Sequence, residues 1–225
     1  MIKKMKFPTL MINTKTYSET SGKDAIALAR IVREVAKNTK KNIVLCVQAS
    51  DICQTSMVHE GVLAQHVDIQ SPGSNTGKIH LKSLKENGAI GSLINHSENR
   101  IPFKHIAETI AILQESKLYA VVCVKTPREA KKVAKLSPDV IAIEPPKLIG
   151  GDVSVTNADP KIISKSVEAV HKINPNIPVL CGAGIKSGLD VKRAIDLGAR
   201  GVLVASGVTK ASNKKKAIID LIKGL

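Results

Sequence analysis

The segment Val140-Ile141-Ala142-Ile143-Glu144 decides the fold class, because it joins a short, wholly apolar run to a single carboxylate. The apolar residues do not alternate with polar ones, which is typical of a strand buried on both faces in a parallel sheet. Runs of the same kind recur from one end of the chain to the other. The predicted strands are Pro8–Ile12, Ile43–Val47, Val62–Val67, Ala89–Ile94, Tyr119–Val124, Val140–Ile143, Ile177–Leu180 and Val202–Val204.

Amphipathic stretches with a helical period separate these strands. The predicted helices are Lys23–Asn38, Asp51–Val58, Leu81–Glu86, Phe103–Ser116, Pro127–Leu136, Pro160–Ile173 and Leu189–Leu197. Eight strand-plus-helix units in 225 residues give about 28 residues per unit, close to the size of a βα repeat. We therefore predict an α/β protein with a closed (β/α)8 barrel, the architecture called a TIM barrel, with a six-stranded α/β sheet as the alternative. No Pro-, Gly- or Ser-rich linker divides the chain, so residues 1–225 are expected to form one domain.

The composition limits the classes of ligand and location. The chain has 34 Lys and Arg against 19 Asp and Glu, a formal net charge of +15, which attracts phosphate groups. Aromatic residues make up only 2%, too few for a platform that stacks single-stranded nucleic acid, so we expect an anionic small molecule and no nucleic acid. No apolar run approaches the ~18 residues that span a bilayer, and the apolar stretch near the N-terminus is too short for a secretory signal. We expect a cytoplasmic protein that does not enter a membrane.

The cysteines predict neither a disulfide framework nor a metal site. Cys46, Cys53, Cys123 and Cys181 are far apart, with no C-x-x-C pair and no histidine at metal-ligand spacing. Three of them end apolar runs, where a small buried side chain is the ordinary interpretation. The G-x-G-x-x-G and G-x-x-x-x-G-K-[ST] motifs are absent as well, which excludes the common dinucleotide-binding and P-loop interpretations.

Reacting groups of such a barrel lie at the carboxyl ends of the strands. The residues that follow the predicted strands there are Asn13 and Lys15, then Gln48, then Asn95-His96-Ser97-Glu98, then Lys125, Glu144, Gly182-Ala183-Gly184 and Ala205-Ser206-Gly207. A carboxylate, an imidazole and an ammonium on one rim supply what proton transfer needs.

Glu144 is the candidate base, since a carboxylate at the mouth of an apolar strand is partly desolvated. His96 is the candidate proton donor: Ser97 is expected to cap the next helix, whose N-terminal dipole would favour a neutral imidazole. Lys15 is placed to hold an anion and stabilise an oxyanion. The small residues after the seventh and eighth strands predict a phosphate site built from backbone N–H groups, and 147–151 predicts a mobile flap.

Taken together, six motifs resemble those of the triosephosphate isomerase family, and they run in order over nearly the whole chain. They are Asn13-x-Lys15, Gly73-Ser74-Asn75-Thr76-Gly77, Asn95-His96-Ser97-Glu98-Asn99-Arg100, Glu144-Pro145-Pro146 through Gly150, Cys181-Gly182-Ala183-Gly184-Ile185 and Leu203-Val204-Ala205-Ser206-Gly207. The compact length and the Gly-Ala-Gly loop are similar to the short archaeal branch of that family.

The resemblance implies interconversion of dihydroxyacetone phosphate and D-glyceraldehyde 3-phosphate without metal or organic cofactor. It implies Glu144 as the base, His96 as the neutral electrophile and Lys15 as the cation that faces the enediolate and phosphate. It also implies that Asn13 helps to place the substrate oxygen. The residues expected to bind the phosphate through their backbones are Gly150, Gly184, Ala205 and Ser206.

Two further residues gain a role only from the resemblance. Glu98 would support the site from behind, and Thr76 would enter the site of a neighbouring subunit, which implies a homodimer or homotetramer. The chain departs from the family pattern at Gly151-Asp152, where Thr-Gly is usual, and we expect altered flap kinetics or weaker substrate binding there.

Two alternatives remain at this point. Other phosphate-binding barrels, such as phosphoribosyl isomerases and thiamine-phosphate synthases, share the paired glycine-rich loops. They lack the combination of Asn13-x-Lys15, His96-Ser97-Glu98 and Glu144-Pro145. A basic scaffold or nucleic-acid binder built on an inactive barrel would bind polyanions in a salt-dependent manner and show no isomerase turnover.

Overall fold

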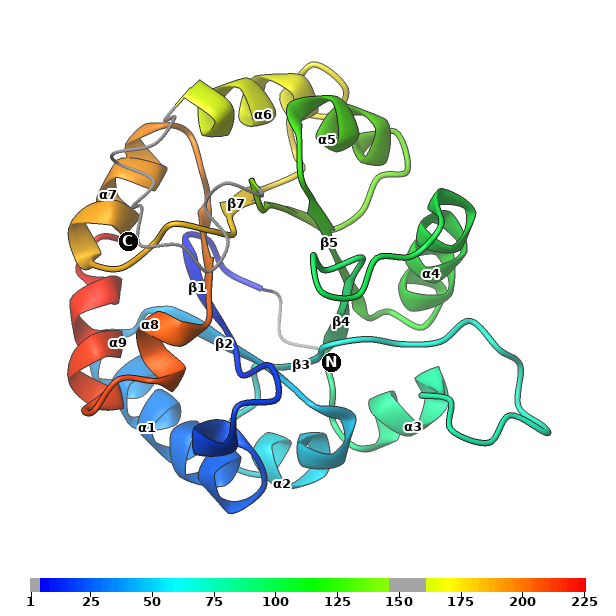
Figure 1. The fold of residues 1–225 in the computed structure, drawn as a ribbon, viewed down its shortest axis with the longest axis horizontal. Helices are drawn as coiled ribbons and strands as arrows, with labels where there is room; N and C mark the ends of the chain where they lie inside the picture. The colour runs from blue at the N-terminus through cyan, green and yellow to red at the C-terminus, as the bar shows by residue number, and fades with distance from the viewer. Residues whose placement is uncertain (1–4, 146–160) are drawn as a thin grey trace.

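The structure is a computed structural model that describes residues 5–145 and 161–225. Its strands form a closed parallel barrel in which each strand pairs with the next along the chain and β8 pairs with β1 (Figure 1). The strands are β1 (Thr9–Asn13), β2 (Asn42–Val47), β3 (Val62–Ala64), β4 (Gly91–Ile94), β5 (Tyr119–Val124), β6 (Val140–Ile143), β7 (Val179–Cys181) and β8 (Gly201–Val204). The predicted (β/α)8 barrel is confirmed, and the six-stranded alternative is wrong.

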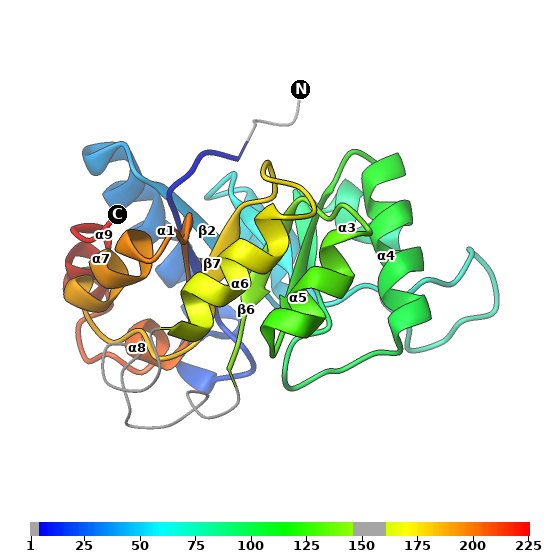
Figure 2. The same cartoon turned by 90° about the horizontal axis from the view of Figure 1, so that it is seen from above.

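Helices surround this barrel on the outside (Figures 1 and 2). The α-helices are α1 (Lys23–Thr39), α2 (Ile52–Ser56), α3 (Leu81–Glu86), α4 (Phe103–Glu115), α5 (Pro127–Ala134), α6 (Lys161–His171), α7 (Gly188–Asp196), α8 (Ser206–Thr209) and α9 (Lys214–Ile222). Two short 3-10 helices, η1 (Ser18–Thr20) and η2 (Ala49–Asp51), lie in the segments after β1 and β2. Within the described ranges, no helix is both long and apolar enough to cross a membrane.

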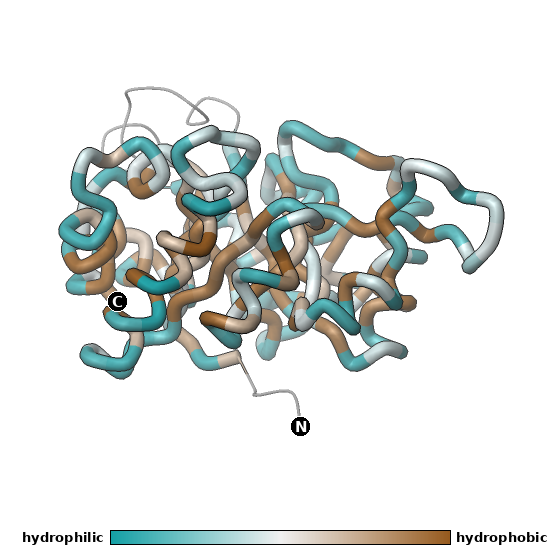
Figure 3. The backbone as a smooth tube through the Cα atoms, turned by 90° about the horizontal axis from the view of Figure 1, so that it is seen from below, coloured by the Kyte–Doolittle hydropathy of each residue, from teal (hydrophilic) through white to brown (hydrophobic). Residues whose placement is uncertain are grey.

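Both faces of the strands are buried, as their uninterrupted apolar sequences predict. In β2, Val44 and Cys46 belong to one buried cluster, and Ile43, Leu45 and Val47 belong to another. Since successive side chains of a strand point to opposite faces, the first cluster fills the barrel and the second packs beneath the helices. Figure 3 shows hydrophobic residues along the central strands and hydrophilic residues in many of the outer loops.

Side chains alternate along each strand between the barrel interior and the surrounding helices, and this alternation directs residues at the strand ends toward one mouth of the barrel. Met11 and Ala142 both belong to the interior cluster. Two residues further along their strands come Asn13 and Glu144, which are therefore carried to the same face at the carboxyl end. Both are 4% exposed.

Several element boundaries differ from the sequence prediction. β3 ends at Ala64 rather than at Val67, because the next residue, Gln65, turns its side chain onto the segment after β1. α2 is shorter than predicted, and the predicted helix list did not include α9. The segment between β3 and α3 projects beyond the ring of helices (Figures 1 and 2).

Candidate active site

A cavity of about 400 Å³ opens at the carboxyl ends of the strands. Most of the residues predicted to act together line it, and they come from elements far apart in the sequence. These lining residues are Asn13, Lys15, His96, Glu144, Gly184, Ala205 and Ser206. Gly150 and the Gly151-Asp152 departure lie outside the described residues.

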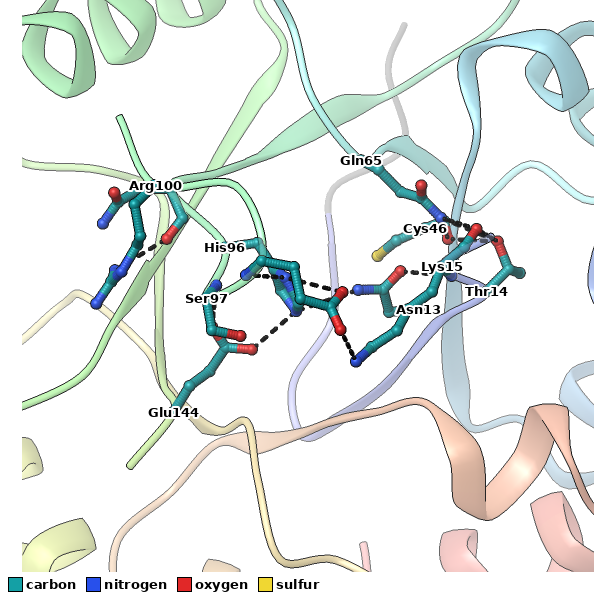
Figure 4. Close-up of polar contacts among 11 residues, drawn as sticks. Asn13, Thr14, Lys15, Cys46, Gln65, His96, Ser97, Arg100 and Glu144 are labelled. Carbon is teal, nitrogen blue, oxygen red and sulfur yellow. Dashed lines mark hydrogen bonds and ion pairs between the residues drawn. The ribbon is translucent and has the colours of Figure 1, made fainter. Parts of the chain in front are cut away.

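His96 and Glu144 face each other across the mouth of the barrel (Figure 4). His96 Nε2 lies 3.0 Å from Glu144 Oε1, and the backbone N–H of Ser97 donates to Glu144 Oε2 at 3.1 Å. Each oxygen of the carboxylate therefore has a partner. Because both side chains are largely buried, the contact is held in surroundings with little water.

The hydrogen bonds around His96 assign its tautomer. The backbone N–H of Glu98 donates to Nδ1 at 3.3 Å, so Nδ1 holds a lone pair. The ring proton of a neutral imidazole is then on Nε2, which donates it to Glu144. A ligand oxygen that takes the place of Glu144 at Nε2 would meet a hydrogen-bond donor.

Lys15 approaches the cavity from the segment after β1. Its ammonium nitrogen lies 2.6 Å from Glu98 Oε1, and its backbone N–H donates to Asn13 Oδ1 at 2.9 Å. Lys15 has a φ of +48°, in the left-handed region that costs energy for a residue with a side chain. The Asn13 amide nitrogen lies 3.4 Å from His96 Nε2, so Asn13 links the Lys15 segment to the imidazole (Figure 4).

Gln65, which sequence reasoning missed, holds that strained segment in place. Its side-chain N–H group donates to Thr14 Oγ1 at 3.0 Å and to the Lys15 carbonyl at 2.9 Å, and lies 3.2 Å from the Cys46 carbonyl. The signal was present, since Gln65 directly follows β3, but the predicted third strand ran past it.

The loop that carries His96 is fixed by a second polar group. Asn95, with a φ of +61°, donates to the Cys123 carbonyl at 2.9 Å and accepts from the Ile101 N–H at 3.2 Å. Arg100 donates to the Asn95 carbonyl and pairs with Glu129 at 3.3 Å. Ser97 does not cap a helix, because α4 begins only at Phe103. That part of the prediction is wrong, and the group next to the ring at this point is instead the backbone N–H of Glu98, which donates to Nδ1.

Small residues form the other side of the cavity. Gly184 has a φ of +73°, which a glycine adopts at little cost. None of the backbone hydrogen bonds in the described segments uses its N–H group. Ser206 and Gly207 begin α8, and the first N–H groups of a helix have no partner inside it. Among the described residues, no backbone bond uses these donors, so they can bind an anion.

Three predicted residues lie away from the cavity. The Gln48 side chain donates to Ser21 Oγ at 3.0 Å, and the Lys125 N–H binds Glu129 at 2.7 Å; neither residue lines the cavity. Thr76 is exposed on the projecting segment between β3 and α3. Glu98 does not line the cavity, but it contacts Lys15 and His96: its N–H group donates to His96 Nδ1, and its carboxylate Oε2 lies 3.6 Å from the same nitrogen.

The buried cysteines beside the site are not nucleophiles. Burial raises the pKa of the Cys123 thiol well above its ordinary value, and the Glu144 carboxylate adds to this shift. Burial also raises the pKa of Cys181 to about 12 and shifts the pKa of Cys46 upward. Cys53 is exposed. In the part of the chain that the structure describes, no group of three or more His, Cys, Asp or Glu side chains is arranged to hold a metal ion.

The chain is similar to known proteins of the triosephosphate isomerase family. The family model of triosephosphate isomerase matches residues 8–224. The chain is 42% identical over 222 residues to a triosephosphate isomerase of Methanobrevibacter smithii, covering 98% of this chain and 100% of that one. It is 44% identical over 216 residues to that of Methanobacterium bryantii, covering 96% of each.

A solved structure is similar in fold. The crystal structure of triosephosphate isomerase from Bartonella henselae aligns with a TM-score of 0.71 and 20% identity, covering 96% of this chain and 99% of that one. At this identity the likeness concerns the barrel alone. The family model, in contrast, matches the sequence over residues 8–224, nearly the whole chain. This chain therefore belongs to the triosephosphate isomerase family.

Proposed function

We propose that the protein interconverts dihydroxyacetone phosphate and D-glyceraldehyde 3-phosphate. The observation that carries this proposal is the contact of 3.0 Å between Glu144 Oε1 and His96 Nε2 in a cavity that also holds a cation and free backbone donors. A base, a neutral proton donor and an anion site are what the isomerisation of a phosphorylated hydroxyketone requires.

Glu144 is the base of this mechanism. Its carboxylate takes a proton from the carbon next to the carbonyl, and the electron pair of that C–H bond forms the C=C bond of an enediolate. The same carboxyl group returns the proton to the neighbouring carbon, so no proton is gained or lost overall. Because Glu144 now accepts from His96 and Ser97, the substrate must displace it from the imidazole before the reaction starts.

His96 and Lys15 stabilise the charge that develops on oxygen. The Nε2–H group polarises the carbonyl and exchanges a proton between the two oxygens, and the Lys15 ammonium offsets the negative charge. Asn13 places the substrate oxygen between these two groups, and Glu98 positions the ammonium from which it accepts a hydrogen bond.

The phosphate is bound at the side of the cavity formed by small residues. Backbone N–H groups of Gly150, Gly184, Ala205 and Ser206 are its donors in this proposal. For Gly184 and Ser206, the support is that these N–H groups are not used by other backbone contacts in the described ranges.

The proposal extends to the assembly and setting of the protein. Residues 1–225 act as one catalytic barrel without a cofactor, in the cytoplasm, as a homodimer or homotetramer in which Thr76 reaches the neighbouring site. The exposure of Thr76 on a projecting segment supports this role. Nucleic acid and membranes are not its partners.

Turnover of D-glyceraldehyde 3-phosphate tests the function, followed through the dihydroxyacetone phosphate that forms and is reduced by a coupling dehydrogenase. The wild-type protein is expected to turn over, and Glu144→Gln is expected to lose about 10³-fold or more in kcat because an amide cannot accept the proton. Folded wild-type protein without turnover would overturn the proposal.

A further inference from the structure

Helix α5 contacts the loop that carries His96 through the side chain of Glu129, which lies in the first turn of that helix. One carboxylate oxygen, Oε1, lies 3.4 Å from the Asn95 amide nitrogen, which donates to it. The other, Oε2, accepts from the Lys125 N–H at 2.7 Å and from Arg100 Nη2 at 3.3 Å. All three contacts come from donors, so a group that only accepts hydrogen bonds is needed to satisfy them together.

Arg100 lies at the edge of the site (Figure 4) and carries this contact to the backbone of the loop. Its Nη1 donates to the Asn95 carbonyl at 3.0 Å and to the Cys123 carbonyl at 3.3 Å. The Asn95 carbonyl belongs to the peptide bond that joins Asn95 to His96. A guanidinium oriented by the Glu129 carboxylate therefore holds the peptide directly before the imidazole.

The Asn95 backbone needs such support, because its φ of +61° is in the left-handed region, which costs energy for a residue with a side chain. Asn95 is only 3% exposed, so its polar contacts are shielded from water. Its neighbour His96 meets Glu144 at 3.0 Å. A shift of the Asn95 backbone would move the imidazole relative to the base, while the phosphate side of the cavity, built from the loops after β7 and β8, would stay in place.

From this geometry we infer that Glu129 is a positioning residue of the reaction, which fixes the His96 imidazole through Arg100 and Asn95. The inference rests on the proposed function. Glu129 is not among the described residues that line the cavity, so its effect passes through the loop. Because His96 stabilises charge that develops only as the proton moves, loss of the Glu129 carboxylate lowers kcat and leaves KM nearly unchanged.

A carboxylate in the first turn of a helix also stabilises the helix itself, and Thr126→Ala is the control for that local effect. The Thr126 side chain caps α5 by accepting from the Glu129 N–H at 3.1 Å, so its loss weakens the start of α5 without removing the carboxylate. Glu129→Gln keeps the size of the side chain but turns an NH2 group toward groups that are donors themselves.

Steady-state kinetics compare these variants. Glu129→Gln is expected to lower kcat roughly tenfold, with KM and the inhibition constant of inorganic phosphate within about twofold of the wild-type values. Thr126→Ala should lower the melting temperature but keep kcat within about twofold. Arg100→Lys should lower kcat by a factor similar to that of Glu129→Gln, and combining the two should add little, because both act on the same peptide.

Three results would overturn the inference: equal kcat in Glu129→Gln and Thr126→Ala, a loss confined to KM, or losses that multiply in the double variant. NMR of protein with isotope-labelled histidines, recorded without substrate, separates this failure from that of the proposed function. The His96 signals, identified by their absence in His96→Gln, should shift in Glu129→Gln and stay in place in Thr126→Ala. If the wild-type protein shows no turnover, this shift still supports the fixing of the imidazole by Glu129, and unshifted signals refute it.

Discussion

At Gly182 the chain passes so close to Glu144 that even a methyl group would press on the base. A Cβ atom there would lie 2.8 Å from Glu144 Cγ and 3.0 Å from the Ile143 carbonyl oxygen. Carbon atoms in contact prefer about 3.5–4.0 Å. The absence of a side chain at Gly182 is thus part of what places the carboxylate.

Gly182→Ala should therefore impair catalysis more than folding. We expect kcat to fall by about tenfold or more as Glu144 is displaced, and stability to fall by about 1–3 kcal/mol through overpacking. Turnover assays together with urea unfolding measure both effects. Wild-type kcat in a variant of wild-type stability would show that the contact does not position the base.

Gln65 gives a second prediction at this scale, because it supports the positive φ of Lys15. Gln65→Met should cost about 1–3 kcal/mol of stability and raise KM severalfold, since the Lys15 carbonyl and Thr14 hydroxyl lose their donor. Gln48→Met is the control, with one side-chain bond to Ser21 and no contact with the cavity. Equal KM values in the two variants would contradict a role for Gln65.

The sequence predicted the residues whose position depends on strand direction alone. Asn13 and Glu144 lie at the ends of buried strands, so alternation and the barrel rule locate them. Gln65 was not recognised as a residue at a strand end, because the third strand was predicted to extend to Val67. Lys125 satisfied the same rule but does not line the cavity; its N–H group donates to Glu129, four residues further along the chain.

On the scale of elements, the start of α7 is tied to the cavity through one side chain. Ser187 and Asp190 form a capping box, and Asp190 also accepts from the Lys186 N–H group. The loop that lines the phosphate side is thereby fixed by the same carboxylate that begins the helix.

Asp190→Ala should destabilise both the start of α7 and the loop that lines the phosphate side of the cavity. We expect a loss of about 1–3 kcal/mol from the cap and the unpaired N–H groups, with a larger effect on KM than on kcat. Asp196→Ala serves as the control on the same helix, because its exposed pair with Lys192 contributes under about 1 kcal/mol. Thermal unfolding and steady-state kinetics compare them; similar losses in both variants would refute the coupling.

The segment between β3 and α3 depends on the charge of Asp68. Partial burial raises the pKa of this carboxyl, but the Ile79 N–H together with His66 and Lys78 outweighs burial and holds it below its ordinary value of 3.8. A lowered folded-state pKa adds stability above the unfolded pKa, and this stability is lost as pH falls through the folded value. Acid should therefore loosen the projecting segment.

Asp68→Asn tests whether protonation of Asp68 destabilises this segment. Hydrogen exchange in residues 68–80 should accelerate in the wild-type protein as pH falls below about 4, after correction for intrinsic exchange. The variant should show higher opening at neutral pH and little further change in acid. An identical pH profile in both proteins would contradict the assignment.

Element prediction succeeded where local signals were strong. α5 begins at Pro127, as predicted, and the structure adds that the Thr126 side chain caps it by accepting from the Glu129 N–H. The predicted end of β3 was wrong, since Gln65 directs its side chain to the segment after β1. The predicted limits of α2 were wrong as well.

At the scale of the whole molecule, closure of the barrel brings both ends of the sequence to one site. β1 pairs with β8, so Asn13 and Lys15 meet the loop at Ser206 across a single cavity. The number of repeats made closure predictable. The repeats do not predict the number of subunits. The proposed assembly is inferred from the projecting segment between β3 and α3.

Sedimentation analysis tests the proposed assembly. The chain of 24.0 kDa should sediment as a dimer or tetramer, and Thr76→Arg should weaken association because a buried, unpaired charge is costly. Its turnover per chain should fall in step with dissociation. A wild-type monomer with full activity would contradict the shared site.

Proton transfer by Glu144 is the central claim, and deuterium uptake from solvent measures it most directly. In D₂O, the wild-type protein should exchange the C–H hydrogens next to the carbonyl of dihydroxyacetone phosphate, as followed by NMR. Glu144→Gln should still bind inorganic phosphate but exchange at least about 10³-fold more slowly. Exchange at the wild-type rate in that variant would mean that another group removes the proton.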